Sequence, residues 1–416
     1  MNNVTAWRNG VVAAYAGSGL IFASWVSRIP AIRDDLGLTP GQVGIMLLCM
    51  SLGSFSSVAA SSLVVLRLGS KLTSRLCVVV LTLGVLIMGL GATALADPLV
   101  VGVGLVLVGL GTGSWNTSSN IEGAAVERAL GRHIMPRLHG SFSIGTVAGA
   151  GLGALAASWH VPVAVHLWAI ALVVCLAVWI GTGHYQADKL LAPPVAVDLA
   201  DDAAEPARAA AAKKAGKAKI AAAWRDPRTL LLGVLVLGLG LAEGAAGDWV
   251  ALAFVDGYGS TAAIGAIGYG IFVSAMTIGR FAGTVVLDKF GRVAVLRVSA
   301  ALAVAGLALF VFAPGVEIAL SALLLWGLGS ALGFPVAMSA ASDDMEHAAA
   351  RVSVVSTLGY GAFLGGPPLL GLLAEHVGVL HSLLAVLVML LIAFFLTPAV
   401  RKPASLAQTA MAGAKG

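Results

Sequence analysis

The sequence predicts an all-α membrane protein with twelve transmembrane helices, arranged as two six-helix bundles with both termini in the cytoplasm. Three observations predict this class. Only 11% of the 416 residues are charged, against roughly 25% in a soluble domain, and 59% are hydrophobic. Apolar runs of about 20 residues, each able to cross a hydrocarbon core of about 30 Å, recur along the chain, and the second half repeats the first. A soluble enzyme is excluded, because it would expose a large apolar surface, and we expect no enzymatic activity.

The apolar runs define twelve spans in two series of six. The first series is 10–29, 41–66, 76–95, 98–121, 138–159 and 162–182. The second series is 228–252, 262–287, 293–313, 316–341, 352–375 and 378–397. We therefore predict four parts: an N-terminal bundle (1–182), a linker (183–227), a C-terminal bundle (228–400) and a tail (401–416).

The basic residues predict the orientation. If the N-terminus is cytoplasmic, 22 of the 25 Lys and Arg residues fall on the cytoplasmic side, as the positive-inside rule requires. The exceptions are Arg28, Arg33 and Arg280. The linker is rich in Ala, Pro and charge, and it is expected on the same side. Its stretch 207–224 is either a basic helix on the anionic inner leaflet or a solvated linker.

Short matches at a nearly constant offset relate the two halves. Arg67-Leu68-Gly69 corresponds to Lys289-Phe290-Gly291 at an offset of 222, and Gly109-Leu110-Gly111 corresponds to Gly327-Leu328-Gly329 at 218. Two similar six-helix halves are a known plan of secondary transporters, which bind their solute between the halves near the middle of the membrane.

A loop motif in each half resembles a signature of a known family. Asp288-Lys289-Phe290-Gly291-Arg292, between the eighth and ninth spans, is similar to the D-R-x-G-R-R loop of the major facilitator superfamily. The first-half copy has Leu66 in place of the acidic residue. Four longer blocks resemble the fucose-permease-like branch, and more closely a set of poorly characterised bacterial inner-membrane proteins within it. These blocks are residues 24–34, 120–128, 242–249 and 365–371. The resemblance covers nearly all twelve spans and implies the fold and a transport function.

Ionisable side chains at membrane depth are costly, so each is a candidate functional residue. Glu243, near the middle of the seventh span, is the first candidate for proton coupling and a candidate for solute binding, with an ion pair to a neighbouring helix as the alternative. Asp248 points about 140° away from it and either binds solute in the outer vestibule or caps a helix. Glu122 is a second proton-coupling candidate, with pairing to basic loop residues as the alternative. Arg280 either extends toward the cytoplasmic surface of the membrane or meets a carboxylate on another helix.

Amide and aromatic side chains supply candidates for solute binding. Asn116 and Asn120 lie on one face of the fourth span and could bond the hydroxyls of a sugar-like solute, or bond a neighbouring helix. In fucose-permease-like proteins the position of Asn116 tends to be acidic, which puts proton coupling through this helix in question. Trp25 and Tyr360 could stack on a ring-shaped solute, or they could be packing residues.

Charges in the cytoplasmic loops are candidates for gating. We expect a network that holds the inner ends of the helices together in the outward-open state and breaks when the halves rock, with a solvated cluster as the alternative. The candidates are Arg67, Lys71, Asp288, Arg292, Asp343 and Asp344. Position 66 has leucine in place of the acidic residue of the signature. The charge network of the first half is therefore expected to be weaker, unless Glu127 supplies the missing carboxylate.

These patterns predict a secondary active transporter that moves a small polar solute, such as a sugar, across the bacterial inner membrane by proton-coupled alternating access. The alternatives are proton-antiport efflux of drugs or metabolites, and a sensor or scaffold without transport. The expected partners are the solute, the proton and the lipid bilayer. Nucleic acid is not expected, because the basic residues are scattered. No cofactor or metal is expected, because phosphate-loop and paired-His motifs are missing, and the chain is expected to be a monomer.

Overall fold

The computed structural model describes residues 2–131, 134–186, 218–344 and 347–402, and this part of the chain is helical and has no β-strand. Most of the predicted linker (187–217) and of the predicted tail (403–416) lies outside the described residues. The helices before the linker are α1 (Asn2–Val26), α2 (Ile29–Leu36), α3 (Pro40–Leu90), η1 (Gly91–Leu95), α4 (Pro98–Leu130), α5 (Met135–Ser158) and α6 (Val163–Thr182). Those after it are α9 (Pro227–Leu252), η2 (Ala253–Gly257), α10 (Ala262–Phe290), α11 (Arg292–Phe312), α12 (Val316–Ser330), α13 (Gly333–Ala341), α14 (Ala348–Ser382), α15 (Leu384–Leu396) and η3 (Thr397–Val400).

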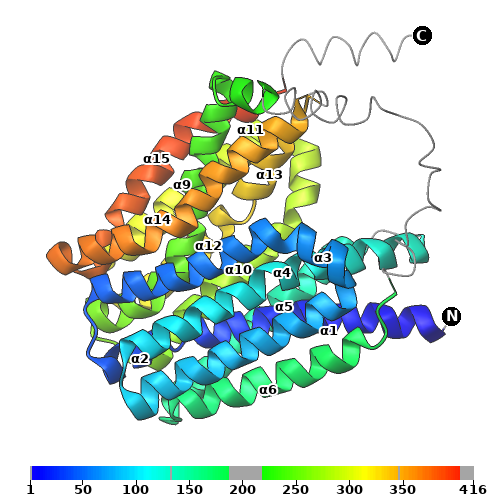
Figure 1. The fold of residues 1–416 in the computed structure, drawn as a ribbon. Coiled ribbons are helices and arrows are strands. Elements are labelled where there is room, and N and C mark those ends of the chain that lie inside the picture. Colours follow the sequence, from blue (N-terminus) through cyan, green and yellow to red (C-terminus); the bar gives the residue numbers. More distant parts are fainter. Residues whose placement is uncertain (1, 132–133, 187–217, 345–346, 403–416) are drawn as a thin grey trace, which may run out of the picture.

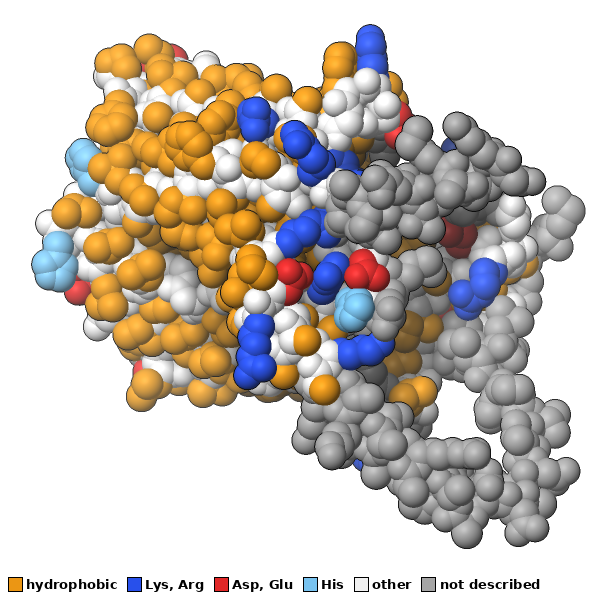
Figure 2. Space-filling view, turned by 90° about the horizontal axis from the view of Figure 1, so that it is seen from above, with side chains coloured by type: hydrophobic (Ala, Val, Ile, Leu, Met, Phe, Trp, Pro, Cys, Tyr) orange, Lys and Arg blue, Asp and Glu red, His pale blue; other side chains and the backbone are white. Residues whose placement is uncertain are grey.

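Eleven helical stretches in the described residues are long and apolar enough to cross a membrane, and a shorter apolar stretch, Leu384–Val400, follows them. Large apolar side chains point outward along these helices; Leu66 and Leu99 are 84% and 80% exposed. Figure 2 shows apolar side chains over the broad part of one face, with charged side chains gathered toward one end of it. Such a surface suits lipid contact around the middle and water at the end.

Glycines with positive φ separate consecutive spans, and they make two predicted loops much shorter than expected. Gly69 (φ 76°, ψ 165°) is the one residue with non-helical φ and ψ inside α3, so the loop expected at 67–75 is otherwise helical. Gly291 has nearly the same backbone (φ 75°, ψ 162°), and so does Gly378 (φ 79°, ψ 158°) inside α14. Only glycine adopts such angles without steric strain. The chain therefore turns through one residue, and the break at Gly378 lies where the twelfth span was predicted to begin.

The repeat seen in the sequence is present in the packing. Gly109 of α4 lies against the backbone of Met50 in the first part of α3, and Gly327 of α12 lies against the backbone of Phe272 in α10. Met50 and Phe272 are 222 residues apart, the same offset that relates the two loop motifs. An added Cβ at either glycine would come within 2.1 to 2.3 Å of the facing carbonyl oxygen. Glycine is required at both places because the helix backbones are in contact.

Helix starts follow the sequence closely. Thr39 accepts a hydrogen bond from the backbone N–H of Gln42 while the Gln42 side chain accepts one from the backbone N–H of Thr39, which makes a capping box before Pro40. Asp97 and Asp226 cap α4 and α9 by accepting a hydrogen bond from the backbone N–H of Leu99 and of Arg228, and each stands directly before a proline. An acceptor side chain followed by proline is a typical helix start.

We refer to the described residues before the linker as the N-half and to those after it as the C-half. We call the end where α1 begins the inner end, following the orientation that the basic residues predict, and the opposite end the outer end. Figure 1 shows the helices packed side by side, with helices of the C-half such as α14 and α15 tilted against those of the N-half. The halves meet mainly through two helix pairs, α3 with α14 and α5 with α10. Any path for a solute between the halves therefore lies between these two seams.

Candidate solute cavity and gates

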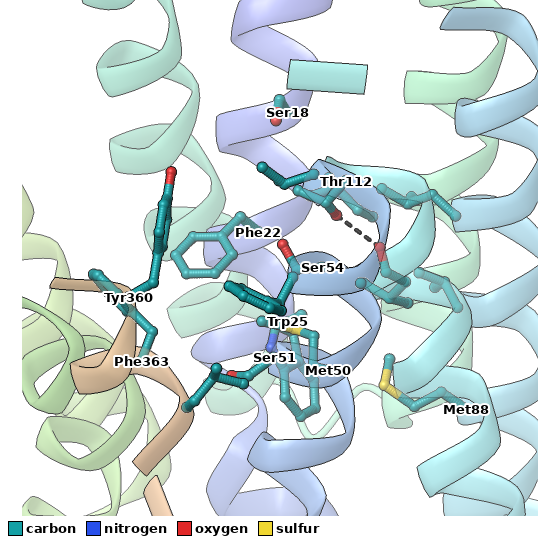
Figure 3. A pocket seen from close by; sticks show the side chains of 18 residues that line it. Ser18, Phe22, Trp25, Met50, Ser51, Ser54, Met88, Thr112, Tyr360 and Phe363 are labelled. Carbon is teal, nitrogen blue, oxygen red and sulfur yellow. Dashed lines mark hydrogen bonds between the residues drawn. The ribbon is translucent and has the colours of Figure 1, made fainter. Parts of the chain in front are cut away.

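A cavity of about 290 Å³ lies near the middle of the helices, where α1, α3 and α4 meet α14 (Figure 3). Most of its wall is apolar, and hydroxyl and indole groups supply the polar part. The lining residues with a polar group are Ser18, Trp25, Ser51, Ser54, Thr112 and Tyr360. A wall of this kind suits a small solute with an apolar face and a few hydrogen-bonding groups.

Two predicted aromatic residues lie in this wall. Trp25 is 2% exposed, and its indole N–H has no acceptor among the described residues. A buried N–H without an acceptor costs free energy, which an acceptor on a solute would recover. Tyr360, on α14, is 40% exposed and meets Phe55 of α3 edge-on, with ring centroids 6.3 Å apart. This aromatic pair joins the two halves beside the cavity.

The two predicted asparagines lie outside the cavity wall but face an accessible space. Asn116 and Asn120 are both exposed although they lie well inside α4. Their Oδ1 atoms accept hydrogen bonds from α1: Ser18 Oγ to Asn116 at 3.5 Å, and the Tyr15 hydroxyl to Asn120 at 2.7 Å. The structure thus shows the interhelical bonds that were the alternative to solute binding. The amide groups also remain accessible to a solute.

Glu243 and Arg280 form an ion pair at membrane depth. The Arg280 Nη2 atom lies 2.9 Å from Glu243 Oε1, and the side chains are 37% and 27% exposed. Glu243 is 16 residues after the start of α9, about 24 Å along the helix. Arg280 comes from the neighbouring α10, so the expectation that it meets a carboxylate on another helix is confirmed. The pair is open to the interface between the halves, where the charge of Arg280 acts on the exposed His139 of α5.

Asp248 lies on the same helix, five residues nearer the outer end. Among the described residues its carboxylate has neither a hydrogen-bond partner nor an ion-pair partner, and it is part-buried. The nearby ring of Tyr269 comes within 3.9 Å of where a Cβ of Gly247 would lie. A carboxylate without a partner at this depth is costly and is therefore a candidate for binding a proton or a solute donor.

Glu122 lies away from the cavity, in a buried cluster at the inner end of the N-half. Its carboxylate accepts hydrogen bonds from Trp7 Nε1 at 2.5 Å, from the Ser70 hydroxyl, and from the backbone N–H of Gln186 at 3.4 Å. The side chain is fully buried. These bonds join α1, the inner turn of α3, α4 and the segment after α6. The geometry favours an anchor between helices over proton coupling.

Of the residues predicted to gate the inner end, Arg292 and Asp343 lie together, but inside the C-half. Asp343, whose side chain is 4% exposed, accepts from Arg292 Nη1 at 2.7 Å and from Arg228 Nη2 at 3.0 Å. Asp344 pairs with Arg351 at 3.3 Å. This network joins the start of α9, the start of α11, the end of α13 and the start of α14.

Two other residues predicted for gating lie outside this network in the structure. Arg67 and Asp288 are exposed, and neither bonds to any described side chain. The reason is geometric: each lies where a span runs directly into the next through a glycine turn, on the outside of the helices. Lys71, in the same region of α3, is half-buried.

Among the described residues, the polar contacts that join the two halves lie at the outer end, and the sequence did not predict them. Arg33 of α2 pairs with Asp256 of η2, and their side chains are 14% and 25% exposed. The Thr39 hydroxyl donates to Glu375 Oε1 of α14 at 2.7 Å. We call these two contacts the outer latch. One sequence signal pointed to it, because Arg33 is one of the three exceptions to the positive-inside rule.

Tight backbone packing accompanies the outer latch. A Cβ at Gly44 would lie 2.6 Å from the Pro367 carbonyl oxygen, and one at Gly371 would lie 2.6 Å from the Pro40 oxygen. The Gly-Gly-Pro-Pro block at residues 365–368, seen in the sequence, therefore belongs to the seam between α3 and α14. The latch and this seam lie nearer the outer end than the cavity does, and the seam holds α3 against α14 there.

Membrane-crossing helices around a cavity between two halves define a multi-pass membrane protein with a site for a small molecule. The family model of the Major Facilitator Superfamily matches residues 11–367. The chain belongs to this superfamily, and two of its curated relatives are named as uncharacterised transporters.

Two curated relatives match over most of their length. An uncharacterised transporter, y4wD, from Sinorhizobium fredii is 29% identical over 394 residues, which cover 92% of this chain and 97% of that protein. Membrane protein MosC from Rhizobium meliloti is 27% identical over 372 residues, covering 89% and 84%.

Solved structures show the same fold at low sequence identity. The nucleoside transporter NupG has a TM-score of 0.71 at 14% identity, with 97% of this chain and 100% of that chain covered. The fucose:proton symporter FucP of E. coli, in the outward conformation, has a TM-score of 0.61 at 17% identity, with 95% and 98% covered. At this identity the likeness supports the fold and leaves the solute open.

Proposed function

We propose that the protein is a secondary active transporter of the bacterial inner membrane that moves a small polar solute by proton-coupled alternating access. The N-terminal bundle (1–182) and the C-terminal bundle (228–400) would rock about the solute site, and the chain would act as a monomer. The symporter and nucleoside-transporter names of the structural neighbours support this class of solute.

One observation carries the proposal: among the described residues, polar side chains join the two halves at the outer end and at no other place. Arg33 and Thr39 belong to the N-half, and their partners Asp256 and Glu375 belong to the C-half. At the inner end, the ion pairs that Asp343 and Asp344 form with Arg228, Arg292 and Arg351 stay inside the C-half. A cavity that is closed on one side by breakable contacts is what alternating access requires. The structure corresponds, in this proposal, to an inward-facing state.

The solute site would combine the cavity with the polar residues beside it. Trp25 and Tyr360 would supply flat faces, and Asn116 and Asn120 would supply hydrogen bonds. Asp248 would bind solute donors above them. Glu243 would carry the coupling proton: protonation breaks its ion pair with Arg280, so the proton load and the arrangement of the site are linked. Glu122, which the sequence suggested for the same task, is better assigned to holding the N-half together.

Gating in this proposal exchanges contacts between the two ends. When the outer latch opens, the inner ends of the two halves approach each other. Arg67 and Asp288, which are exposed in this state, would then find partners across the halves. Arg292, Asp343 and Asp344 would remain paired and act as the rigid frame of the C-half.

Reconstitution in proteoliposomes tests this proposal. A thermal-shift screen against sugars, nucleosides and organic acids identifies solutes, because ligands that bind the folded state raise its apparent stability. Wild-type protein should accumulate such a solute under an inward proton gradient. Glu243→Gln should lose accumulation but keep exchange of labelled for unlabelled solute. Full accumulation by Glu243→Gln would remove Glu243 from the coupling step. A protein that moves no solute under any imposed gradient would favour a sensor or scaffold.

One observation favours a second candidate, which is efflux by proton antiport. The cavity wall is mostly apolar and includes Phe22, Phe55 and Phe363 as well as Trp25. Such a wall would also accept amphipathic drugs or metabolites. Expression that raised resistance to such compounds while sugar uptake stayed flat would support efflux.

A further inference from the structure

The Glu243–Arg280 pair has spare hydrogen-bonding capacity on the cation side. An arginine carries five N–H donors, and Arg280 has one acceptor, Glu243, among the described residues. Its side chain is 37% exposed at the interface between the halves. A pair that served only to join α9 and α10 could be buried between them. This one leaves about a third of the Arg280 side chain exposed at the interface between the halves.

Protonation of Glu243, the step on which the proposed function rests, removes the only described counter-charge of Arg280. An unpaired guanidinium at membrane depth is unfavourable, because no opposite charge then compensates it. Protonation of Glu243 without any other change is therefore unfavourable. A second negative group bound to Arg280 would remove this cost. We infer that the transported solute is an organic anion, whose carboxylate takes the place of the Glu243 carboxylate on Arg280.

The charges balance in both states of the pair. Without solute, the Arg280 cation and the Glu243 carboxylate sum to zero. With solute, the Arg280 cation and the solute carboxylate sum to zero, and Glu243 is a neutral acid that carries the proton. One monovalent anion and one proton cross together, so the moving site is neutral in both directions. A neutral site crosses a low-dielectric region at the lowest electrostatic cost.

The surrounding ionisable groups fit an anion better than a cation. A cationic solute would place a second positive charge beside Arg280. His139 of α5 and Tyr15 of α1 lie on the facing side of the interface, with the two rings edge-on at 5.2 Å. Tyr269 of α10 and Asp248 of α9 lie toward the outer end. Asp248 is the one further carboxylate near the site, and it must be protonated or turned away when an anion binds.

The cavity beside the pair limits the size and shape of the anion. Gly244, next to Glu243, lies 3.3 Å from Phe363, measured from where its Cβ would be, and Phe363 is part of the cavity wall. The Phe363 ring thus lies between the helix that carries Glu243 and the cavity of about 290 Å³, whose lining comes from α1, α3, α4 and α14. A solute with its carboxylate on Arg280 that extended past Phe363 would place its other groups among Trp25, Tyr360 and the serine hydroxyls. A sugar acid or another hydroxylated carboxylic acid has this combination of groups.

Chemical rescue tests the anion site without any transport assay. In Glu243→Gln, Arg280 has no counter-charge, so about 100 mM sodium acetate should raise the apparent melting temperature by about 3 °C or more. Acetamide, the neutral molecule of the same shape, should not, with sodium chloride keeping the ionic strength equal. The double variant Glu243→Gln/Arg280→Gln is the matched control and should respond to neither. Equal responses of Glu243→Gln to acetate and acetamide would overturn the inference.

If Glu243→Gln is poorly folded, wild-type protein gives the same test. Its apparent melting temperature should rise more with glucuronate than with glucose at the same concentration and ionic strength, because only the anion can bind Arg280. Arg280→Gln should abolish this difference, while a difference that survives in Arg280→Gln would contradict the assignment.

A transport arm separates this inference from the proposed function. Proteoliposomes should accumulate a hexuronate such as glucuronate under a pH gradient, with at least tenfold preference over glucose. A membrane potential imposed without a pH gradient should have little effect, since the moving site is neutral. Proton-driven accumulation of glucose without glucuronate would overturn the anion assignment and leave the proposed function standing. Acetate rescue without any gradient-driven uptake would support the anion site and contradict proton-coupled transport.

Discussion

The outer and inner ends of the molecule use charged side chains in opposite ways. At the outer end Arg33 and Asp256 join the N-half to the C-half. At the inner end Asp343 holds Arg228 and Arg292, and all three belong to the C-half. Both ends have ion pairs of similar length and composition. The difference lies in which parts of the chain they join, so one set can break during rocking and the other can persist.

This difference also explains where the basic residues lie. The inner end has most of them, as membrane insertion requires, and a permanent network can use several without affecting gating. The outer end has few, so a single arginine there can act as a switch. Apolar contact between the halves is not confined to the outer end: a Cβ at Gly140 of α5 would lie 2.5 Å from the Phe281 ring of α10. It is the polar contacts that distinguish the two ends.

The largest effect is expected from breaking the inner network. Asp343→Ala would leave Arg228 and Arg292 without their shared carboxylate, which is almost fully buried. We expect a loss of about 3 kcal/mol in the free energy of unfolding. Thermal unfolding of the purified protein measures this loss. Asp344→Ala, at the adjacent but more exposed carboxylate, is the control and should cost about 1 kcal/mol or less. Equal losses would show that Asp343 has no special structural role.

A bulky residue in the seam between α3 and α14 at the outer end should change the balance between outward-open and outward-closed states more than it changes the stability of the fold. In Gly44→Val the added atoms would overlap the backbone at Pro367, which costs about 2 kcal/mol in the closed outer end. The balance should shift roughly 30-fold toward the outward-open state. Labelling of Ser54→Cys from the outside, in protein lacking Cys49, Cys77 and Cys175, measures the shift. Gly151→Val is the control, since no atom lies within 4 Å of a Cβ at that position. Unchanged labelling in Gly44→Val would contradict a closed outer end.

A double-mutant cycle on the ion pair of the outer latch should show a smaller effect. Arg33→Ala and Asp256→Ala should each shift the same labelling toward the outward-open state. Because the pair is only partly buried, we expect a coupling of about 1 kcal/mol, or roughly fivefold. The two effects should not add in the double variant. Additive effects would mean that the residues act independently, whatever their proximity in this state.

The smallest effect is expected at the hydrogen bond of the outer latch. Glu375→Leu removes the acceptor of the Thr39 hydroxyl, and both groups are exposed. A shift of about 0.5 kcal/mol in the same labelling assay is expected. Glu375→Gln retains an acceptor and should behave as the wild type. Equal shifts in both variants would show that the charge of Glu375 matters and its bond to Thr39 does not.

The sequence predicted the fold well, because hydropathy and charge bias are local properties that the membrane imposes directly. It overestimated the loops at Gly69 and Gly291, since a single glycine with positive φ replaces several loop residues. It identified Trp25 and Tyr360, which line the cavity, and Glu243 with Arg280, because ionisable residues are conspicuous in apolar spans. It missed Asp256 and Glu375: their partners lie 223 and 336 residues away, and no local pattern reports such pairs. It also assigned Asp288 to a network that its position outside the helices does not allow in this state.

Cross-linking of the outer latch tests the central claim, that the two halves separate at the outer end in every transport cycle. Arg33→Cys/Asp256→Cys, in protein without the three native cysteines, would be joined by oxidation or a short bifunctional maleimide and reconstituted. The account predicts that joining the residues stops both gradient-driven uptake and solute exchange, and that reducing a disulfide restores them. The single variants, treated in the same way, should remain active. Full transport by the cross-linked protein would contradict the account, because a permanently closed outer end would then be compatible with solute movement.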